Sequence, residues 1–249
     1  MTILEGKNIC KRYRRRDVSV DALADVSFTL EQGEILGIVG ESGSGKSTLL
    51  RQISGLETPD SGEILLDGQP LPAKRTKENY RALQMIFQDA TGSFHPRRKI
   101  SASIRETVHN LCGSNTEPDW AALCAMVQLP AELTDRYPRD LSGGQCQRFA
   151  IARAMAVNPR ILLCDEITSA LDVSSQAQVL HLLADLHKNQ GMSMIFVSHD
   201  LAVVRSICDR VMVMYQGKLV EEGPVADIIH DPREDYTKKL ISSVLEVHI

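Results

Sequence analysis

One stretch constrains this chain more than any other: an apolar run at 35–39 enters a glycine-rich loop, Gly40–Ser47, and a helical pattern follows. The loop fits G-x-x-x-x-G-K-[ST], in which glycines let several backbone N–H groups converge on phosphate oxygens. We therefore predict nucleotide binding, with Lys46 reaching the β- and γ-phosphates and the Ser47 hydroxyl coordinating Mg²⁺. The predicted nucleotide-binding residues are Gly40, Glu41, Ser42, Gly43, Ser44, Gly45, Lys46, Ser47 and Thr48, of which Thr48 is expected chiefly to pack within the helix.

Length and charge set the bounds of the fold. A chain of 249 residues suits one large domain, or one domain with a sub-domain. A formal net charge of −4 and a pI near 6.0 exert no overall attraction for nucleic acid or anionic lipid. The local basic run 11–16 is interpreted as a solvated surface loop in preference to a nucleic-acid site.

The six cysteines include no C-x-x-C pair, which argues against a metal site or a disulfide framework and suits a reducing cytosol. The sequence does not start like a secretion signal, and it has no run of about 18 apolar residues. The chain is therefore expected to be neither secreted nor membrane-spanning by itself.

The order of the patterns predicts an α/β fold. Residues 2–13 and 21–30 indicate two antiparallel strands split by a charged loop, and 83–88 indicates a further strand. Strands and helices alternate again from residue 160 onward, which argues for a mostly parallel sheet covered on both faces. We predict a single domain, 1–249, whose core spans 1–88 and 158–249 with a helical sub-domain inserted at 89–157.

Two acids end the apolar stretch 161–164. Phosphoryl transfer needs an acid at a strand end to hold Mg²⁺, and this role falls to Asp165. Glu166 would point the other way on an extended strand, where it could orient or deprotonate the attacking water. A helix cap or a solvated turn is the alternative interpretation of the pair.

Leu141–Gln145 reads L-S-G-G-Q, and at this spacing from the other motifs it resembles the signature of ATP-binding-cassette (ABC) ATPases. The resemblance covers nearly the whole chain. It implies the ABC form of the P-loop fold, with an N-terminal antiparallel layer and an inserted helical sub-domain. It also implies site residues: Tyr13 stacking on adenine, Gln88 sensing the γ-phosphate and Mg²⁺, His199 contacting the γ-phosphate, and Asp172 in the loop that crosses between subunits. A strand aromatic, a polar strand end and a structural histidine are the respective alternatives for Tyr13, Gln88 and His199.

Residues Ser142, Gly143, Gly144 and Gln145 also suggest a second anion-binding helix start, yet the chain has one phosphate loop. In the resembled family, the signature of one subunit closes over the ATP of the other. We therefore expect head-to-tail pairing with a second ABC ATPase, identical or similar, and inactivity of an isolated monomer. The catalytic set implied is Lys46, Gln88, Glu166 and His199, with Ser47, Gln88 and Asp165 as Mg²⁺ ligands.

The resemblance further implies two separate permease subunits at the cytoplasmic face of the membrane and, indirectly, a solute-binding protein. Segment 89–98 and the tail 221–240 resemble importers of oligopeptides, dipeptides and nickel, although Ala90, His95, Ile167 and Glu234-Asp235 depart from the usual residues. The resemblance implies a peptide, nickel or a metal chelate as cargo, the departures leave the choice among them open, and no iron–sulfur cluster is implied. An exporter ATPase and a soluble ABC ATPase of translation or DNA repair are the alternatives.

Overall fold

The computed structural model describes residues 1–15 and 18–245. These residues separate into two compact units, one formed by 1–74 with 191–249 and the other by 75–190. The α/β fold, with an antiparallel sheet and a mostly parallel one, agrees with the sequence prediction. The proposed boundaries of the core and the helical sub-domain stay a prediction. Over the described residues, no helix is at once long and apolar enough to cross a membrane.

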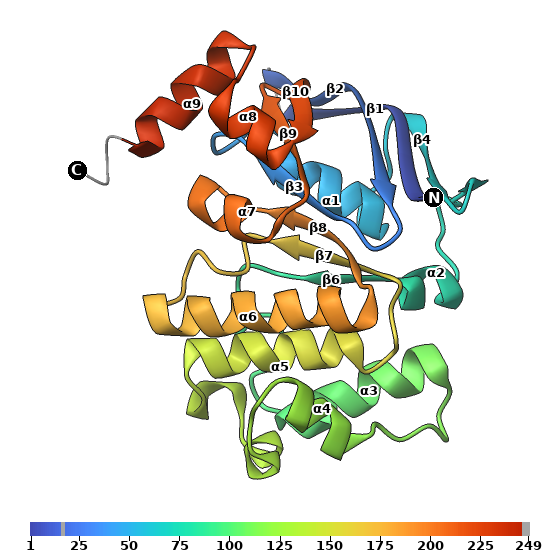
Figure 1. Cartoon of the computed structure of the whole chain (residues 1–249). Coiled ribbons are helices and arrows are strands. Elements are labelled where there is room, and N and C mark those ends of the chain that lie inside the picture. The colour runs from blue at the N-terminus through green and yellow to red at the C-terminus, as the bar shows by residue number, and fades with distance from the viewer. Residues whose placement is uncertain (16–17, 246–249) are drawn as a thin grey trace. The chain divides into compact units, whose positions relative to one another are not determined.

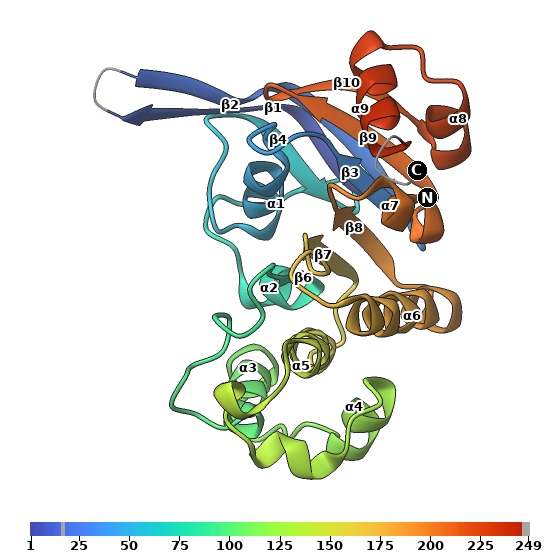
Figure 2. The ribbon, with the colours of Figure 1, turned by 90° about the vertical axis from the view of Figure 1, so that its left-hand side faces the viewer.

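The first unit contains the antiparallel sheet, in the order β2-β1-β4-β5 (Figure 1). Strands β1 and β2 form one long hairpin beside α1 (Figure 2). The bounds are β1 Thr2–Arg15, β2 Val18–Glu31, β4 Ser61–Leu66 and β5 Gln69–Pro70.

The hairpin corrects one expectation. The charged segment interpreted as a loop is mostly strand, because β1 continues to Arg15 and β2 begins at Val18, with Tyr13 paired to Val20. Antiparallel strands with one face toward water accept charged side chains there. Arg16, the last residue of the basic run, lies outside the described residues.

The parallel strands of the first unit are mainly apolar: β3 and β8 are buried throughout, and β9 is buried from Val211 to Met214. β3 lies between β8 and β9 and runs parallel to both, and β10 pairs antiparallel with β9. Burial on both faces explains why β3 and β8 read as continuous apolar runs. The bounds are β3 Ile35–Val39, α1 Lys46–Ser54, β8 Ser193–Val197, α7 Leu201–Ile207, β9 Arg210–Tyr215, β10 Lys218–Pro224, α8 Val225–His230 and α9 Asp235–Leu245.

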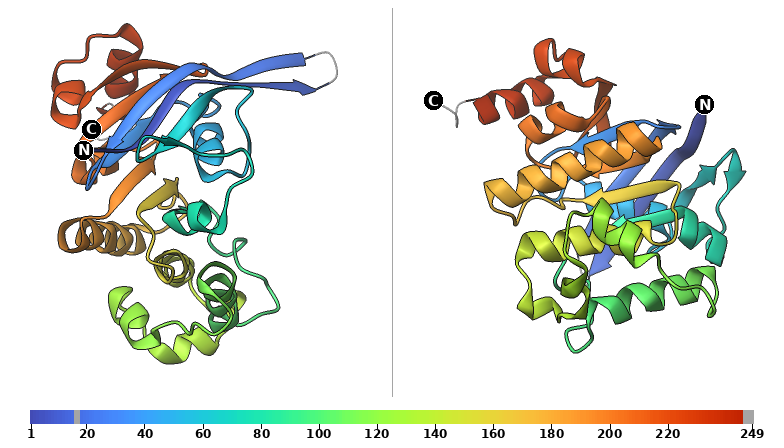
Figure 3. Two further views of the ribbon diagram at one scale, coloured as in Figure 1. Left: turned by 90° about the vertical axis from the view of Figure 1, so that its right-hand side faces the viewer. Right: turned by 60° about the horizontal axis from the view of Figure 1, so that its bottom comes forward.

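The second unit pairs two parallel strands, β6 and β7, with a group of helices. Helix α5 packs against α3, α4 and α6, and the group is drawn in green to orange in Figure 3. Its bounds are α2 Lys77–Ala82, β6 Leu83–Ile86, α3 Ile100–Cys112, α4 Trp120–Met126, α5 Gly143–Met155, β7 Ile161–Asp165 and α6 Val173–Gln190, with short 3₁₀ turns at Ala131–Asp135 and Pro138–Asp140.

Three local boundaries in this unit differ from the sequence prediction. β6 ends at Ile86, so Gln88 follows the strand instead of ending it. The segment taken as merely polar before β6 contains helix α2, which begins after a capping box at Thr76. Helix α5 begins at Gly143, whereas the sequence predicts a helix over 147–156 that Ser142 and the two glycines open.

Candidate functional site

The phosphate loop joins β3 to α1 within the first unit. Two of its glycines are required by close approach as well as by backbone angle. Gly45 has φ 107°, and a Cβ there would lie 2.4 Å from the carbonyl oxygen of Ala22. Gly40 has φ 148°, and its Cβ would lie 2.1 Å from the Met214 carbonyl oxygen. The loop therefore folds as the sequence motif predicts, tightly against β2 and β9.

Lys46 lies inside this loop. Its side chain is buried, with 4% of the residue exposed. The ammonium nitrogen donates hydrogen bonds to the carbonyl oxygens of Gly40 and Glu41, each at 2.8 Å. A positive charge is thus held against the backbone of the loop, and its contact with the β- and γ-phosphates stays a prediction.

The loop also contains features that fit an anion. The Ser44 hydroxyl is buried without a hydrogen-bond partner, which is costly unless a ligand completes it. Gly45, the N-cap of α1, supplies no side-chain cap, and a helix start of this kind favours negative charge. Ser47 and Thr48 are half-buried in the first turn of α1, and Glu41, Ser42 and Gly43 are exposed. A nucleotide phosphate is the group these donors match.

The turn between β9 and β10 supports the loop from outside. The Gly217 N–H donates to the Ser44 carbonyl at 3.0 Å, and the Ala24 N–H donates to the Gly217 carbonyl at 2.8 Å. The phosphate loop is therefore tied to both the N-terminal hairpin and the C-terminal part of its unit. The motif itself gives no sign of this support.

Tyr13 projects from β1 and is 39% exposed. Its hydroxyl hydrogen-bonds to Glu57, and the Lys11 ammonium lies 5.9 Å from the ring centroid. Partial burial and the Glu57 carboxylate raise the pKa of Tyr13, so the hydroxyl stays neutral at physiological pH. An exposed ring on the unit that holds the phosphate loop suits the predicted stacking role.

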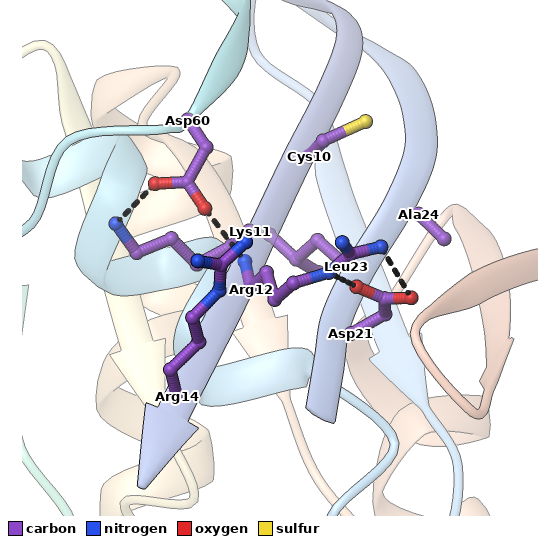
Figure 4. A pocket seen from close by; sticks show the side chains of 8 residues that line it. All are labelled: Cys10, Lys11, Arg12, Arg14, Asp21, Leu23, Ala24 and Asp60. Atoms are coloured by element: carbon purple, nitrogen blue, oxygen red, sulfur yellow. Dashed lines mark hydrogen bonds and ion pairs between the residues drawn. The ribbon is translucent and has the colours of Figure 1, made fainter. Parts of the chain in front are cut away.

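Next to Tyr13 in sequence, a pocket of about 570 Å³ opens on the hairpin (Figure 4). Two ion pairs lie in its wall: Lys11 bonds to Asp60 at 3.0 Å, and Arg12 bonds to Asp21. The Arg12 backbone N–H and the Lys11 ammonium lower the pKa of Asp60. These pairs place Lys11 and Arg12 of the basic run against carboxylates of the same unit.

His199 follows β8 and is exposed. Because β8 runs parallel to β3, with Val197 opposite Ile38, His199 and the start of the phosphate loop occupy the carboxyl ends of neighbouring strands. Asp200 caps α7 by accepting from the Ala202 N–H at 2.8 Å. Contact of His199 with the γ-phosphate stays a prediction.

The second unit brings Gln88 and Glu166 together. The Gln88 amide nitrogen lies 3.4 Å from a Glu166 carboxylate oxygen and 3.1 Å from the Ser169 hydroxyl. Parallel pairing of β6 with β7, from Leu83–Ile161 to Ile86–Cys164, places both residues at one sheet edge. This pairing therefore brings Glu166, the predicted catalytic base, next to Gln88, the predicted γ-phosphate sensor.

The two acids after β7 differ in environment. Asp165 is the last strand residue and is buried, at 9% exposure. Glu166 has φ 49°, so the strand has already ended there and the extended geometry expected for it is wrong. This left-handed backbone turns the chain, and the Glu166 carboxylate reaches Gln88 as a result.

Oxygen donors of the kind Mg²⁺ prefers are present at the predicted positions: a hydroxyl at Ser47, an amide at Gln88 and a carboxylate at Asp165. Among residues 1–15 and 18–245, no group of three or more His, Cys, Asp or Glu side chains is arranged to hold a metal ion. Mg²⁺ at nucleotide sites uses one or two carboxylates and the phosphates themselves, and a Mg²⁺ ion shared by these three donors stays a prediction.

The signature residues cap helix α5. The Ser142 hydroxyl accepts from the Gln145 N–H at 3.2 Å, and the Gln145 side chain accepts from the Ser142 N–H at 3.0 Å. Gly144 lies so close to α6 that a Cβ would be 2.5 Å from the Ser175 hydroxyl. Ser142 and Gly143 are exposed, so the start of α5 is accessible to solvent.

Asp172 caps the neighbouring helix in a similar way. Its carboxylate accepts from the Ser175 N–H at 2.9 Å and from the Ser175 hydroxyl at 2.8 Å. These hydrogen bonds lower the pKa of Asp172. The residue is therefore ionised and ordered at the start of α6.

The segment after Gln88 is fastened to α5 by an arginine that the sequence analysis did not single out. Arg153 donates to the Ser93 carbonyl at 2.7 Å and to the Ser93 hydroxyl at 3.0 Å, and its guanidinium lies 4.4 Å from the Phe94 ring centroid. A groove of about 380 Å³ lies beside this segment. Its lining residues are Gln88, Asp89, Ala90, Thr91, Gly143, Gln147, Ala170 and Leu171.

Cys146, within the signature helix, is buried and its thiol lies 3.3 Å from the Pro138 carbonyl oxygen. Burial raises its pKa, which suppresses the reactive thiolate. These surroundings fit a packing role for Cys146. All six cysteines are free thiols.

Comparison with known proteins agrees with this geometry. A family model described as "ABC transporter" matches residues 23–169. The oligopeptide transport ATP-binding protein OppF of Haemophilus influenzae is 46% identical over 245 residues, which are 96% of this chain and 74% of that protein. OppF of Lactococcus lactis is 41% identical over 243 residues, covering 95% and 76%.

A solved structure described as the dimeric post-hydrolysis state of the ATP-binding cassette MJ0796, bound to ADP and Pi, superposes with a TM-score of 0.79. It is 29% identical and covers 90% of this chain and 99% of its own. The resemblance inferred from the signature is thereby confirmed. The chain belongs to the ABC transporter family.

Proposed function

We propose that this chain is the ATP-binding and ATP-hydrolysing subunit of an ABC importer of oligopeptides. The observation that carries the proposal is the phosphate loop, with Lys46 bonded inside it and an unpartnered Ser44 hydroxyl buried beside it. The names of the two relatives support oligopeptides as cargo. Nickel and metal chelates are the alternative cargo raised by the sequence.

In the proposed reaction, the loop N–H groups and Lys46 bind the phosphates of ATP, while Tyr13 stacks on the base. Glu166 orients a water molecule toward the γ-phosphorus and accepts its proton. The new P–O bond forms as the bond to the β–γ bridging oxygen breaks, which releases ADP and inorganic phosphate. Gln88 and His199 contact the transferred group and stabilise its charge.

Mg²⁺ held by Ser47, Asp165 and Gln88 would neutralise charge on the phosphates. The Gln88–Glu166 contact supports this division of labour, because both side chains already face one site. ATP binding requires Gln88 to exchange its present partners for the γ-phosphate.

We further propose that Ser142, Gly143, Gly144, Gln145 and Asp172 act on the nucleotide held by a second ATPase chain, paired head-to-tail. Support comes from the exposed helix start at Ser142 and from the dimeric state of the similar cassette MJ0796. The partner chain is either a second copy or a similar ATPase.

Opening and closing of this pair would drive two permease subunits at the cytoplasmic face of the membrane, with a solute-binding protein acting indirectly. The groove beside Gln88 supports this proposal, since a permease helix seated there would contact the segment that Arg153 holds. Co-purification with two hydrophobic subunits and a second ATPase is the expected outcome of isolating the assembly.

The dependence of the steady-state ATPase rate on protein concentration tests the proposed function. Rate per chain should rise with concentration and then level off, because the site is completed only by pairing. A rate per chain that stays constant at every dilution would contradict pairing, and complete absence of Mg²⁺-dependent phosphate release in the assembly would contradict the enzymatic proposal.

A further inference from the structure

The C-terminal helix α9 reaches back to the phosphate loop. Tyr236, in its first turn, accepts a hydrogen bond at its hydroxyl from the Glu41 N–H, with a nitrogen-to-oxygen distance of 3.1 Å. The two residues are 195 positions apart in the chain, yet both belong to the first unit. No motif in the phosphate loop calls for this contact.

The peptide group that Tyr236 contacts is also one that binds Lys46. The Glu41 N–H and the Gly40 carbonyl belong to the same planar peptide. Its N–H side bonds to Tyr236, and its carbonyl side accepts from the Lys46 ammonium at 2.8 Å. The next carbonyl, of Glu41, accepts from the same ammonium at 2.8 Å. Hydrogen bonds in series polarise and strengthen one another, so the two ends of this peptide are coupled.

Tyr236 is itself firmly placed. Its ring packs on Tyr215, at the end of β9, with centroids 4.2 Å apart and an interplanar angle of 33°. The chain entering α9 is anchored by Glu221, whose carboxylate accepts from the Arg233 N–H at 2.8 Å and the Glu234 N–H at 3.2 Å. Burial raises the pKa of Tyr236, so its hydroxyl is neutral at physiological pH.

We infer that Tyr236 is a positioning residue for phosphate binding: its hydroxyl fixes the Gly40–Glu41 peptide, and that peptide in turn holds Lys46 in the orientation that receives a nucleotide. The inference rests on the proposed function and adds the C-terminal helix to the elements that shape the phosphate site. Rotation of this peptide would remove the Gly40 carbonyl from Lys46 and misplace the ammonium.

Because Lys46 reaches the β- and γ-phosphates, the contribution of Tyr236 is specific to nucleotides that carry them. ATP and ADP affinity depends on the hydroxyl, and AMP affinity does not. This distinction separates a positioning role from a general packing role.

The test compares Tyr236→Phe with Tyr215→Phe, measured by competition against a fluorescent ATP analogue and by thermal unfolding without nucleotide. Both variants keep the stacked rings and lose one hydroxyl. The Tyr215 hydroxyl bonds to Gln216, outside the phosphate loop, which makes it the matched control. Loss of one hydrogen bond of ordinary strength predicts ATP and ADP affinity about three- to tenfold weaker in Tyr236→Phe alone, with AMP affinity within about twofold of the parent.

Parental ATP affinity in Tyr236→Phe would overturn the inference. So would an equal loss for ATP and AMP, or an equal loss of ATP affinity in both variants, since each indicates packing instead of positioning. A parent chain that binds no ATP at all would contradict the proposed function, and this inference would fall with it.

Discussion

The phosphate loop and the Gln88–Glu166 edge are built in contrasting ways. The loop buries its lysine, bonds it twice to its own backbone and is held from outside by Gly217 and Tyr236. In the second unit, Gln88 is exposed, and its amide nitrogen lies 3.4 Å from a Glu166 carboxylate oxygen. The loop is thus preformed for a phosphate. The Gln88 amide, in contrast, is bonded to Glu166 and Ser169, and it must leave these partners before it can contact a nucleotide. The contrast predicts that loop variants lose binding and that edge variants lose turnover.

Lys46→Ala should produce a large loss of ATP binding. Removal of a buried, charge-assisted partner predicts affinity about 10- to 100-fold weaker, measured by equilibrium titration with ATP. Lys218→Ala, which removes an exposed lysine from the same unit, serves as the control and should bind as the parent does. Equal ATP affinities in the two variants would contradict the claim that the phosphate loop binds the nucleotide through Lys46.

Arg153→Ala tests how firmly the segment after Gln88 is held. The substitution leaves the Ser93 carbonyl without its donor and removes the contact with Phe94, so the free energy of unfolding should fall by about 2 kcal/mol in denaturant titrations. Arg148→Ala is the matched control on α5, since Arg148 donates to the Val127 and Gln128 carbonyls.

Both arginine variants should be destabilised, but only Arg153→Ala should lower ATPase stimulation by the permease subunits. Equal stimulation in the two would mean that the 89–94 segment does not depend on α5 for its function.

Ser142→Ala separates capping from nucleotide contact. Ser142 and Thr76 both cap helices of the second unit through capping boxes. Each alanine variant should therefore lower the free energy of unfolding by about 1 kcal/mol. Only Ser142→Ala should also lower the ATPase rate at saturating protein concentration, and matching rates in the two variants would leave Ser142 with a structural role alone.

Glu221→Gln should have the smallest effect, and one that depends on pH. Burial of Glu221 favours a higher pKa, but hydrogen bonds from the Arg233 and Glu234 N–H groups and the nearby Arg233 charge hold the folded pKa below the ordinary value for a glutamate. The carboxylate therefore stabilises the fold above the unfolded pKa, and this contribution is lost as pH falls through the folded value.

The free-energy difference between parent and Glu221→Gln should then be below about 1 kcal/mol, after solvent screening, at pH 6 to 7. It should shrink and vanish as pH falls below the pKa of the unfolded glutamate and then through the lower folded pKa, in chemical denaturation. A difference that grows on acidification would reverse the assigned direction of the pKa shift.

Local pattern was enough to predict the phosphate loop and the buried strands β3, β7 and β8, whereas the role of Gln88 at the γ-phosphate and Mg²⁺ came only from the family resemblance. These features arise within a few residues of a motif, or from parallel pairing of neighbouring strands. The extension of the β1–β2 hairpin could not be predicted in this way, because cross-strand pairs such as Arg12–Asp21 stabilise a segment whose composition resembles a loop.

The contacts that support the site also could not be predicted from local sequence patterns, because they join residues that are far apart in the chain. Tyr236 meets Glu41 across 195 positions, and Arg153 meets Ser93 across 60. The tail around Tyr236 did carry a signal, since it resembled the importer pattern, but the resemblance pointed to cargo and gave no spatial partner. Nothing in the sequence marks the Ser44 hydroxyl as buried without a partner.

The division between binding and turnover is tested most directly by Glu166→Gln, with ATP affinity and phosphate release measured on the same preparation. The amide keeps the shape of the side chain but cannot accept the proton of the attacking water. ATP affinity should stay at the parental value, while the turnover rate falls about 10²- to 10⁴-fold and a closed, ATP-bound pair accumulates. Turnover near the parental rate would contradict the assignment of Glu166 as the base and the account built on it.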